Sequence, residues 1–547
     1  MNNAKEYRKI ITKILSGEIK TKSDLNEEKR KLSTKLKLNK FIRNSEILKH
    51  AKPGEKPELN LLLKKPTRTT SGVAIVAVMT KPDKCPHGKC KYCPGGVDIG
   101  SPQSYTGKEP AARRAIRYNF DPYLQTTLRI SQLKTIGHKT SKIELIIMGG
   151  TLTAQCIDYQ EFVVKECLRA MNEFNENYEF LIKSGEEKFL EKYKDKKPTF
   201  QYLEDIQKQN ETAPARCVGM TFEPRPDWAR CDQIDYMLKF GVTRIEMGVQ
   251  NPYDFIYNRI NRGHTVSDVV CATQELKDSG IKVGYHLMPG ILGNNPEQDM
   301  RAVHKIFNDP RFMPDMIKIY PLIVIKGTEY YDWWKAGSFE PMTTDEAIEL
   351  IVKIKAMLPK WVRTMRIMRD IPSNLVEAGI KPSNLGELVY KRMDELGIKC
   401  KCIRCREVSQ FLKKGIEPKI NDVKLTRIDY DASCGKEIFL SFEDVKQDIL
   451  IGFLRLRIPY EPHRSEIVNA SIVRELHIYG PMVEVNEKPK YEFQHRGYGA
   501  ELLKEAERIT KEEFNLNKIL VISGIGAREY YRKFGYERDG VYMGKGL

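Results

Sequence analysis

Six short apolar runs, separated by helical patterns, constrain the fold of this chain more than any other feature. Most are rich in Val, Ile and Met, are apolar on both faces and end in Gly or a polar residue. Strands of this kind, alternating with amphipathic stretches such as "DQIDYMLKFG", are typical of a parallel sheet. We therefore expect an α/β fold built on a partial (β/α)6 barrel, or an open relative of one. The runs occupy residues 73–80, 143–150, 217–224, 243–250, 282–290 and 316–323.

The length of 547 residues predicts several domains rather than one. After about residue 435 the pattern changes to long alternating runs such as "ILIGFLRLRIPY", followed by a helix, a strand and a helix, which indicates a separate α+β domain. The charged segment 189–211 interrupts the barrel pattern and is expected to be an exposed insertion. We divide the chain into a basic N-terminal region (1–70), the barrel (71–343), a linker with a cysteine cluster (344–434) and the α+β domain (435–547).

Positive charge is concentrated at the start of the chain. The formal net charge is +18, and residues 1–70 hold 19 Lys and Arg against 8 Asp and Glu, which gives +11 for this region alone. The basic residues alternate with Leu, Ile and Phe at near-helical spacing, so one face can pack while the other attracts a phosphate backbone. The alternative is a solvated basic face without a partner.

Twelve cysteines indicate metal sites in a reducing cytoplasm rather than a disulfide framework, because six of them form two tight clusters. No apolar run approaches the ~18 residues that a membrane span needs, and the N-terminus lacks the apolar core of a signal peptide. We expect a cytoplasmic protein without a membrane partner.

The first cluster, Cys85, Cys90 and Cys93 in "KCPHGKCKYCPGG", directly follows the first predicted strand. In α/β barrels the chemistry lies at the carboxyl ends of the strands. Three thiolates can hold three irons of a [4Fe–4S] cluster and leave the fourth iron open. The alternative is a structural zinc ion, for which His87 is the one nearby further ligand.

Polar and glycine residues end the next three strands at the same rim. Glycines allow a ligand to approach the backbone closely, although a glycine pair alone is more often a tight turn. Together with the cysteines they predict a binding site. These residues are Gly149, Gly150 and Thr151 after the second strand, Glu223 after the third and Gln250 after the fourth.

A second glycine motif lies in the α+β domain, in "QHRGYGAELL" at residues 494–503. Gly497 and Gly499 permit a tight turn whose N–H groups, with the N-terminus of the following helix, can bind a pyrophosphate. An ordinary helix start is the alternative.

The second cysteine cluster, Cys400, Cys402 and Cys405, lies in the linker. Zinc needs four ligands, for which Cys434, a histidine or water are candidates, and reduced cysteines that pack or touch RNA are the alternative. In the same linker "WVRTMRIMRD" carries Arg363, Arg366 and Arg369, either a basic stripe toward RNA or ordinary solvated charges.

Two of these motifs carry family resemblances. The three-cysteine loop, with Tyr92 before its last cysteine, resembles the cluster loop of radical S-adenosylmethionine (SAM) enzymes, which implies a [4Fe–4S] cluster on the cysteines and SAM against the rim residues. The Q-x-x-G-x-G turn resembles the acetyl-CoA motif of GCN5-related (GNAT) acetyltransferases. It implies that a tyrosine lies by the thioester sulfur and that one strand donates backbone hydrogen bonds to the acetyl group. The implied acetyl-CoA residues are Gln494, Gly497, Tyr498, Gly499, Ala500, Glu475, Leu476, His477, Ile478, Tyr530 and Tyr531.

The combination of the two domains resembles the family of Elongator catalytic subunits along nearly the whole chain, through "SYTGKEPAARRAIR", "NRGHT", "SIVRELHIYG" and "YYRKFGY". The resemblance implies a tRNA carboxymethyluridine synthase that acts on the wobble uridine of the anticodon stem-loop and needs an electron donor. A SAM-derived radical would take hydrogen from the acetyl methyl group, and the carbon radical would add to carbon 5 of a uridine turned out of its loop. Lys142 matches a family lysine associated with acetyl-CoA, so we predict Lys142, Tyr530 and Tyr531 as catalytic residues.

Two other functions stay open at this point. One is a protein lysine acetyltransferase in which the iron–sulfur cluster is only structural. The other is a non-catalytic tRNA-binding scaffold. The sequence also leaves open whether the chain forms a homodimer.

Overall fold

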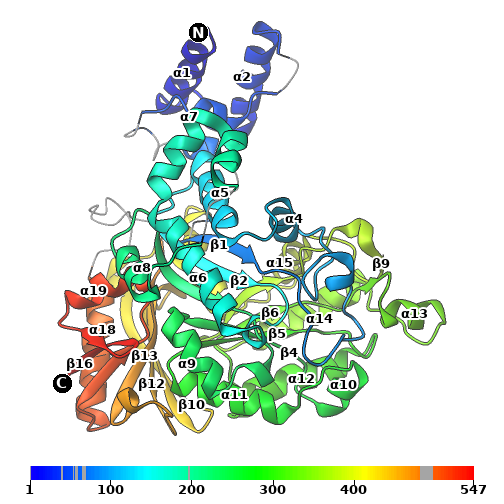
Figure 1. The fold of residues 1–547 in the computed structure, drawn as a ribbon, viewed down its shortest axis with the longest axis vertical. Helices are drawn as coiled ribbons and strands as arrows, with labels where there is room; N and C mark the ends of the chain where they lie inside the picture. Colours follow the sequence, from blue (N-terminus) through cyan, green and yellow to red (C-terminus); the bar gives the residue numbers. More distant parts are fainter. Residues whose placement is uncertain are drawn as a thin grey trace.

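The computed structural model describes residues 2–38, 41–52, 55, 59–63, 69, 71–194, 198–480 and 497–547. Gln494 of the predicted acetyl-CoA motif lies outside the described residues. Figure 1 shows a group of N-terminal helices at one end of the molecule and two sheets at the other.

The central sheet has seven parallel strands in chain order, and its edges are β1 and β8. It is therefore an open half-barrel, and all six predicted strands are present in it. The seventh strand, β8, lies in the segment that we assigned to the linker, so the sheet extends beyond residue 343. The strands are β1 (Ala74–Met79), β2 (Lys142–Met148), β3 (Arg216–Phe222), β4 (Arg244–Gln250), β5 (Lys282–Leu287), β6 (Met316–Ile319) and β8 (Arg363–Ile367).

Helices of residues 110–412 surround this sheet, and local signals fix where several of them begin. For example, Asp121 caps a helix that has Pro122 at its first position, and Thr265 forms a capping box with Asp268. The helices are α4 (Pro110–Arg117), α5 (Pro122–Thr135), α6 (Ile157–Asn172), α7 (Phe174–Tyr193), α8 (Leu203–Asn210), α9 (Cys231–Phe240), α10 (Asp254–Arg259), α11 (Val266–Asp278), α12 (Pro296–Asn308), α13 (Glu329–Lys335), α14 (Thr344–Met357), α15 (Leu385–Glu395), α16 (Ile403–Arg406) and α17 (Val408–Leu412).

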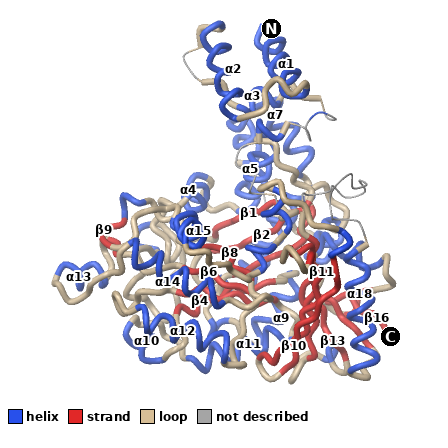
Figure 2. Tube along the Cα trace, turned by 180° about the vertical axis from the view of Figure 1, so that it is seen from behind, coloured by secondary structure: helices blue, strands red, loops and turns tan. Residues whose placement is uncertain are grey.

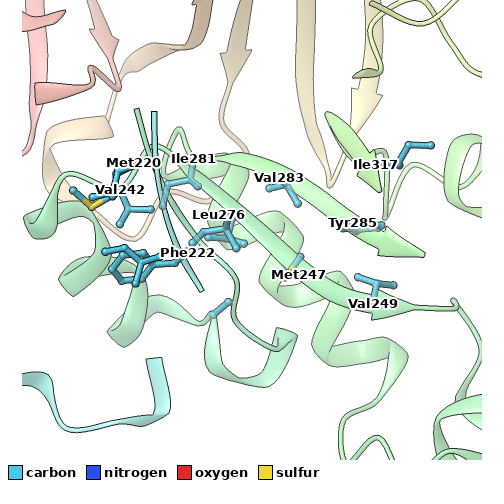
Figure 3. Close-up of a cluster of buried hydrophobic side chains, with 14 of the residues drawn as sticks. Met220, Phe222, Val242, Met247, Val249, Leu276, Ile281, Val283, Tyr285 and Ile317 are labelled. Carbon is cyan, nitrogen blue, oxygen red and sulfur yellow. The ribbon is translucent and has the colours of Figure 1, made fainter. Parts of the chain in front are cut away.

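Strands β2 to β6 have an apolar outer face and polar or charged residues on the inner face, whereas β1 is apolar on both faces. On β4, Ile245, Met247 and Val249 belong to the hydrophobic core, of which Figure 3 labels Met247 and Val249, whereas Glu246 and Gln250 face the interior. The prediction that most of these strands are apolar on both faces is therefore confirmed only for β1 and is wrong for strands such as β4. Charged residues occupy its inner positions because that face lines a cavity.

The segment predicted as an exposed insertion, residues 189–211, is buried at its two ends and mostly exposed between them, as far as the structure describes it. Phe189 on α7 and Leu203 and Ile206 on α8 are buried, and α8 lies against α6. Glu211, just after α8, pairs with Arg528 of the C-terminal domain at 3.1 Å. The expectation is therefore wrong for the buried faces of α7 and α8, whose charged residues mark only their outer faces, and confirmed for most of the described residues of 191–202.

The N-terminal helices α1 (Asn2–Leu15), α2 (Lys22–Lys35) and α3 (Asn44–Leu48) share their own small core. Ile11 and Ile47 are fully buried in it, and Figure 1 places α1 and α2 beyond α5 and α7, away from the sheets. These helices form a separate basic unit at the end of the molecule.

The C-terminal sheet is mostly antiparallel, as predicted, and Figure 2 shows it beside the half-barrel. Only the pair β13 and β14 is parallel, and β10 begins before the predicted boundary at residue 435. Its elements are β10 (Val423–Ala432), β11 (Gly435–Asp444), β12 (Ile449–Ile458), β13 (Ala470–Ile478), β14 (Lys518–Val521), β15 (Glu537–Asp539), β16 (Tyr542–Gly546), α18 (Tyr498–Arg508) and α19 (Arg528–Arg532).

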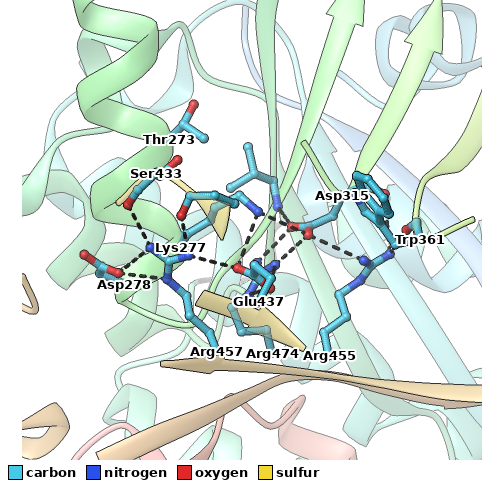
Figure 4. A network of polar contacts seen from close by, with 12 residues as sticks. Thr273, Lys277, Asp278, Asp315, Trp361, Ser433, Glu437, Arg455, Arg457 and Arg474 are labelled. Atoms are coloured by element: carbon cyan, nitrogen blue, oxygen red, sulfur yellow. Dashed lines mark hydrogen bonds and ion pairs between the residues drawn. The ribbon is translucent and has the colours of Figure 1, made fainter. Parts of the chain in front are cut away.

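A buried network of ion pairs joins the two sheets (Figure 4). Arg474 on β13 reaches Asp315, directly before β6, at 2.9 Å and Glu437 on β11 at 2.8 Å. Lys277 on α11 lies 3.4 Å from Asp315, and Arg457 on β12 lies 3.0 Å from Glu437. Each of these side chains is at most 1% exposed. Arg474 and Lys277 thus each pair with a carboxylate of the other domain, Arg474 with Asp315 and Lys277 with Glu437.

Across the described residues, the helices lack the combination of length and apolar character that a bilayer crossing requires.

Candidate active site

One cavity of about 1530 Å³ lies between the half-barrel and the C-terminal sheet. Single-ligand pockets usually measure about 300–1,000 Å³, so this cavity has room for more than one ligand. Most of the site residues that we predicted from the sequence line this cavity, and they come from both domains. They are Cys85, Lys142, Gly149, Gly150, Thr151, Glu223, Gln250, Glu475, Leu476, His477, Ile478, Gly497, Gly499, Ala500, Tyr530 and Tyr531.

Two predicted cysteines and one tyrosine lie just behind the cavity wall. Cys90 and Cys93 are 6% and 1% exposed. Tyr498 packs against Phe442, with ring centroids 4.9 Å apart, and is the one described residue of the predicted acetyl-CoA turn that does not line the cavity.

The sulfur atoms of the first cysteine cluster receive hydrogen-bond donors. The Ser104 N–H lies 3.1 Å from the Cys93 Sγ, and the Arg262 Nη1 lies 3.4 Å from the Cys90 Sγ. Although burial alone would lower the pKa of Arg262, Tyr92 and Cys90 raise it, so the guanidinium stays charged. Cationic and N–H donors stabilise thiolates, which are the form that binds iron.

The spacing of these three sulfurs favours a cluster over one ion. A tetrahedral zinc ion holds its sulfurs about 3.8 Å apart, given Zn–S bonds of about 2.3 Å. Among the described residues, the compact groups whose ligand atoms all lie within 4.8 Å do not include Cys85, Cys90 and Cys93 together. The site therefore fits a multi-iron cluster.

The rim glycines have steric reasons to be glycine. Gly149 has φ +127°, and a Cβ there would lie 2.6 Å from the Thr80 hydroxyl, which donates a hydrogen bond to the Gly149 carbonyl at 2.9 Å. Gly150 has φ +71°. Beside them the Thr151 hydroxyl lies 3.7 Å from the Cys85 Sγ. A bare stretch of backbone thus reaches the cysteine loop.

A charged cluster that sequence reasoning missed lies inside the half-barrel. The Lys318 Nζ lies 2.8 Å from the Glu223 Oε1 and also pairs with Glu246, which has Arg244 and His286 as further neighbours, each at 3.1 Å. Burial alone would raise the pKa of Glu246, but Lys318 and Arg244 hold it well below its usual value. The signal in the sequence was a charged residue at an inner position of an otherwise apolar strand, as in "MIKIY".

The Lys318 ammonium, rather than a metal ion, balances the negative charge of the two carboxylates in this cluster. Glu223, Glu246 and His286 are close enough to ligate one ion, but the Lys318 ammonium already contacts both carboxylates. Glu223, which we predicted as a ligand-binding residue at the rim, is thus engaged in an ion pair with Lys318. By contrast, the buried Gln250 Oε1 has no hydrogen-bond partner among the described residues.

On the opposite wall of the cavity, helix α18 begins with two positions that need glycine for different reasons. Gly497 is the N-cap and has φ +95°, a left-handed conformation that favours glycine. Gly499 would place a Cβ 2.5 Å from the Tyr530 hydroxyl. The first turn of α18 therefore presents bare N–H groups, beneath that hydroxyl, to a negatively charged ligand.

The two predicted tyrosines lie in different surroundings. Tyr530 is 38% exposed, whereas Tyr531 is 6% exposed and packs in the core of the C-terminal domain. Burial raises the pKa of Tyr530 to about 12 and that of Tyr531 further, so both hydroxyls are protonated at neutral pH and can donate.

Strand β13 parts from β14 beside these tyrosines. Within the described residues the parallel ladder ends at the pair Val473 and Val521. The following residues, Glu475 to Ile478, then line the cavity. This opening is where a ligand would accept backbone hydrogen bonds.

Lys142 begins β2 and lines the same cavity. Burial, together with the positive charges of Lys139 and Arg216, lowers its pKa to about 8. Its amine therefore changes charge near physiological pH.

The second cysteine cluster is compact and buried. Cys400, Cys402 and Cys405 have ligand atoms within 4.8 Å of one another, and the sulfurs of Cys402 and Cys405 are 3.7 Å apart. Cys434, the predicted fourth ligand, is exposed and not part of this group, because it lies in the turn that joins β10 to β11. Instead, the Lys355 Nζ lies 3.5 Å from Cys402 and 3.4 Å from Cys405.

The predicted stripe of arginines lines the cavity and does not lie on the outer surface of the molecule. Arg363 is buried and pairs with Glu407 at 2.7 Å, and it also donates to the Tyr479 hydroxyl at 2.6 Å. Arg366 and Arg369 line the cavity. They add positive charge where a phosphate could enter.

Four protein families match successive parts of the chain, in the same order as the domains described above. The ELP3 N-terminal domain matches residues 4–70, the radical SAM superfamily residues 79–306, the radical SAM C-terminal domain residues 314–395 and the acetyltransferase (GNAT) family residues 416–536. The half-barrel and the C-terminal sheet are therefore a radical SAM domain and a GNAT domain, which imply a [4Fe–4S] cluster with SAM and acetyl-CoA, respectively.

Full-length relatives match as well. The chain is 55% identical over 513 residues to the tRNA uridine(34) acetyltransferase of Methanocaldococcus jannaschii, covering 92% of this chain and 90% of that protein. It is 42% identical over 536 residues to human Elongator complex protein 3, covering 96% and 93%. The solved structure of Methanocaldococcus infernus Elp3 with an N-terminal deletion (1–46) matches with a TM-score of 0.74 and 50% identity, covering 88% of this chain and 100% of that one.

Proposed function

Because the chain belongs to the family of Elongator complex protein 3 and the archaeal tRNA uridine(34) acetyltransferases, we propose that it converts the wobble uridine of tRNA to 5-carboxymethyluridine, using acetyl-CoA and radical SAM chemistry. One observation carries the proposal. A single cavity is lined by the cysteine loop and by the first turn of α18, so a radical SAM site and an acetyl-CoA site share one space. An acetyltransferase whose cluster is only structural would not need this opening.

On the half-barrel side, Cys85, Cys90 and Cys93 would hold the [4Fe–4S] cluster, with Ser104 and Arg262 donating hydrogen bonds to the sulfurs of Cys93 and Cys90. Gly149, Gly150, Thr151 and Gln250 would contact SAM. When bound, the cluster and SAM supply a radical strong enough to remove hydrogen from an unactivated methyl group. The unpartnered Gln250 Oε1 is available for a ligand N–H or hydroxyl.

On the GNAT side, the pyrophosphate of acetyl-CoA would bind the N-terminus of α18 at Gly497 and Gly499. The thioester would then lie between the open edge of β13 and the tyrosine hydroxyls, with its methyl group toward the half-barrel. Tyr530 and Tyr531 would donate to the thioester, and Lys142 would provide a positive charge from the opposite wall.

The substrate uridine would enter the same cavity as an unstacked base. A single-stranded anticodon loop allows this at lower cost than a duplex does. The basic helices α1 to α3 would bind the tRNA backbone, and Arg366 and Arg369 would meet the phosphates nearest the base.

We also propose that Cys400, Cys402 and Cys405 bind a structural zinc ion. The 3.7 Å between the sulfurs of Cys402 and Cys405 suits one tetrahedral ion, and the nearby Lys355 ammonium would offset the thiolate charge. Elemental analysis of the purified protein should find zinc, which Cys402→Ser should lose and Cys434→Ser should retain. Equal zinc content in both variants would contradict the assignment.

Nucleoside analysis tests the main proposal. The protein with reconstituted cluster, given tRNA, SAM and deuterated acetyl-CoA, should form 5-carboxymethyluridine and transfer deuterium to 5′-deoxyadenosine. Cys90→Ala should lose both products but keep its affinity for acetyl-CoA. A reaction that acetylates protein lysines and leaves the uridine unchanged would reject the proposal.

A further inference from the structure

Helix α13 lies against the outer side of the cysteine loop, away from the cavity. The Glu329 N–H donates to the Lys91 carbonyl at 3.1 Å, and the Lys91 Nζ pairs with the Glu329 carboxylate at 3.3 Å. Figure 1 shows α13 protruding from the half-barrel on the side opposite the GNAT domain. This helix is therefore the surface feature attached directly to the backbone between Cys90 and Cys93.

Aromatic side chains connect this surface to the cysteines. Cys90, Cys93 and Tyr92 belong to one hydrophobic cluster with Tyr330, and Trp333 and Trp334 pack against its outer edge. The rings of Tyr330 and Trp333 are 4.8 Å apart. A short run of packed aromatic groups thus leads from the molecular surface to the cysteine loop.

Basic side chains surround the outer aromatic rings. The Lys91 Nζ and the Arg259 guanidinium lie 5.0 Å and 5.3 Å from the centre of the Trp333 ring, and the Lys335 Nζ lies 4.6 Å from that of Trp334. The α13 surface, as we define it, carries five basic residues against Glu329 and Asp332, which leaves three positive charges. The basic residues are Lys89, Lys91, Arg259, Lys326 and Lys335.

Most of this charge is available to a partner. Lys89, Arg259 and Lys335 are exposed, and within the described part of the chain no carboxylate is ion-paired with them. An open pocket of about 310 Å³ lies in the same surface, lined by Lys91, Asn258, Arg259, Trp333 and Ser338. The surface is thus basic, aromatic and slightly concave.

We propose that the α13 surface is the docking site for an acidic electron-carrier protein that reduces the [4Fe–4S] cluster. The inference rests on the proposed function, which requires one electron at the cluster from outside. In this step the reduced carrier loses one electron and the cluster gains it, and no bond is formed or broken. Because the cavity is to be filled by SAM, acetyl-CoA and the uridine, the electron has to arrive from the outer side of the cysteine loop.

Charge complementarity selects this class of partner. Electron-transfer encounters have small interfaces, below about 1,200 Å², and depend on electrostatic steering for fast association. RNA also binds basic and aromatic residues, but it is a less suitable partner for the α13 surface. Both Lys91 and Arg259 already lie over Trp333, so stacking a base on that ring would displace a cation.

Stopped-flow reduction tests the proposal. The reconstituted protein is mixed with an excess of reduced low-potential ferredoxin, an acidic iron–sulfur protein, and the loss of cluster absorbance is followed. Replacing Lys89, Arg259 and Lys335 by Glu should slow reduction about tenfold or more at low salt, with the difference shrinking as salt is added. Reduction by dithionite, which needs no docking surface, should be unchanged.

A matched variant controls for net charge. Lys353→Glu, Lys424→Glu and Lys511→Glu alter exposed lysines elsewhere by the same total charge and should leave the ferredoxin rate unaltered. Ferredoxin binding to the cluster-free protein, measured by titration calorimetry, should weaken only in the α13 variant. If the α13 variant misfolds, the milder Gln substitutions at the same positions should give an intermediate rate.

Three results would overturn the proposal. They are equal ferredoxin rates in the α13 variant and the wild type, an equal slowing with dithionite, and a loss of tRNA affinity in place of ferredoxin affinity. None of these measurements uses acetyl-CoA or uridine modification. A failure of the proposed reaction is therefore distinguishable from a failure of the docking surface.

Discussion

Lys142 is a cation in surroundings that disfavour a positive charge. Burial is the main cause of its pKa of about 8, and two neighbouring basic residues add to it. An exposed lysine titrates at about 10.4, so the unfolded chain keeps this ammonium to higher pH than the folded protein does. Burying the ammonium therefore lowers the free energy of unfolding at pH values below about 8, and this destabilisation decreases as the pH rises toward about 10.4. A residue kept at such a cost is a candidate for a role in binding.

We expect the affinity for acetyl-CoA to fall as the pH rises through about 8, because Lys142 then loses the charge proposed to bind the ligand. Lys142→Arg keeps its charge, so its affinity should persist to higher pH, whereas Lys142→Met should bind weakly at every pH. Calorimetric titrations between pH 6.5 and pH 9.5 measure this. Identical pH profiles for the wild type and the Arg variant would contradict the role of Lys142.

Gly499 provides a second test. Gly499→Glu would direct a bulky negative group at the Tyr530 hydroxyl and the phosphate-binding turn, so acetyl-CoA binding and uridine modification should be abolished while the iron content is unchanged. Gly546→Glu is the matched control, because a Cβ at that position would meet no atom of the described residues within 4 Å. Retained acetyl-CoA binding in Gly499→Glu would remove this turn from the site.

The sequence was most informative where function depends on adjacent residues. The cysteine loop and the glycine turns were predicted because their spacing along the chain sets their geometry. The cluster around Lys318 was not, because Glu223 and Glu246 lie on other strands and nothing local shows which face of a strand borders a cavity. Arg363 was misinterpreted for a similar reason, since Glu407, which neutralises it, lies 44 residues further along.

Among the helices and strands, those with a clear apolar period were predicted well. All six expected strands of the half-barrel and the main elements of the C-terminal domain are present. Strand β8 was missed because its arginines made "RTMRI" resemble a surface segment. Its arginines are instead directed inward, where other elements and the cavity accommodate them.

The N-terminal helices give a prediction for a whole structural unit. Deleting residues 1–70 should weaken tRNA binding and reduce its dependence on salt, because these residues carry +11 of the net charge. Acetyl-CoA affinity should not change. Filter-binding titrations at several salt concentrations measure the first effect and calorimetry the second.

The related Methanocaldococcus infernus structure lacks its first 46 residues, so the remaining domains of that protein are folded without them. As a variant of the complete chain, replacing the exposed Lys20, Lys22, Arg30 and Lys37 by Ala should reproduce part of the loss. An unchanged salt dependence in both variants would exclude this unit from the RNA site.

Over the whole molecule, the two catalytic domains should unfold together. Their interface contains buried charges that pair across it, so separating the domains would leave Asp315 without Arg474 and Glu437 without Lys277. Burial alone would raise the pKa of Asp315, yet Arg474 and Lys277 hold it well below its usual value. A carboxylate kept ionised in this way requires its partners.

Arg474→Ala should therefore destabilise both domains at once, by about 3–5 kcal/mol, which is the typical effect of removing one member of a buried ion pair. Differential scanning calorimetry should show one transition for the half-barrel and the GNAT domain, shifted to lower temperature in the variant. Arg508→Ala, which removes exposed ion pairs on α18, should hardly shift it. Two separate transitions in the wild type would mean that the interface does not couple the domains.

The same interface determines when the protein can finish folding during its synthesis. Domains usually fold in order as they leave the ribosome. Here Asp315 lies 159 residues before Arg474, which pairs with it from the other domain, so the half-barrel gains this partner only after the strands of the GNAT domain have emerged. A chain that stops before the GNAT strands would leave Asp315 with Lys277 but without Arg474, in an unfinished interface that quality-control proteases would recognise. The cell should therefore accumulate the complete two-domain enzyme and almost none of the radical SAM half alone.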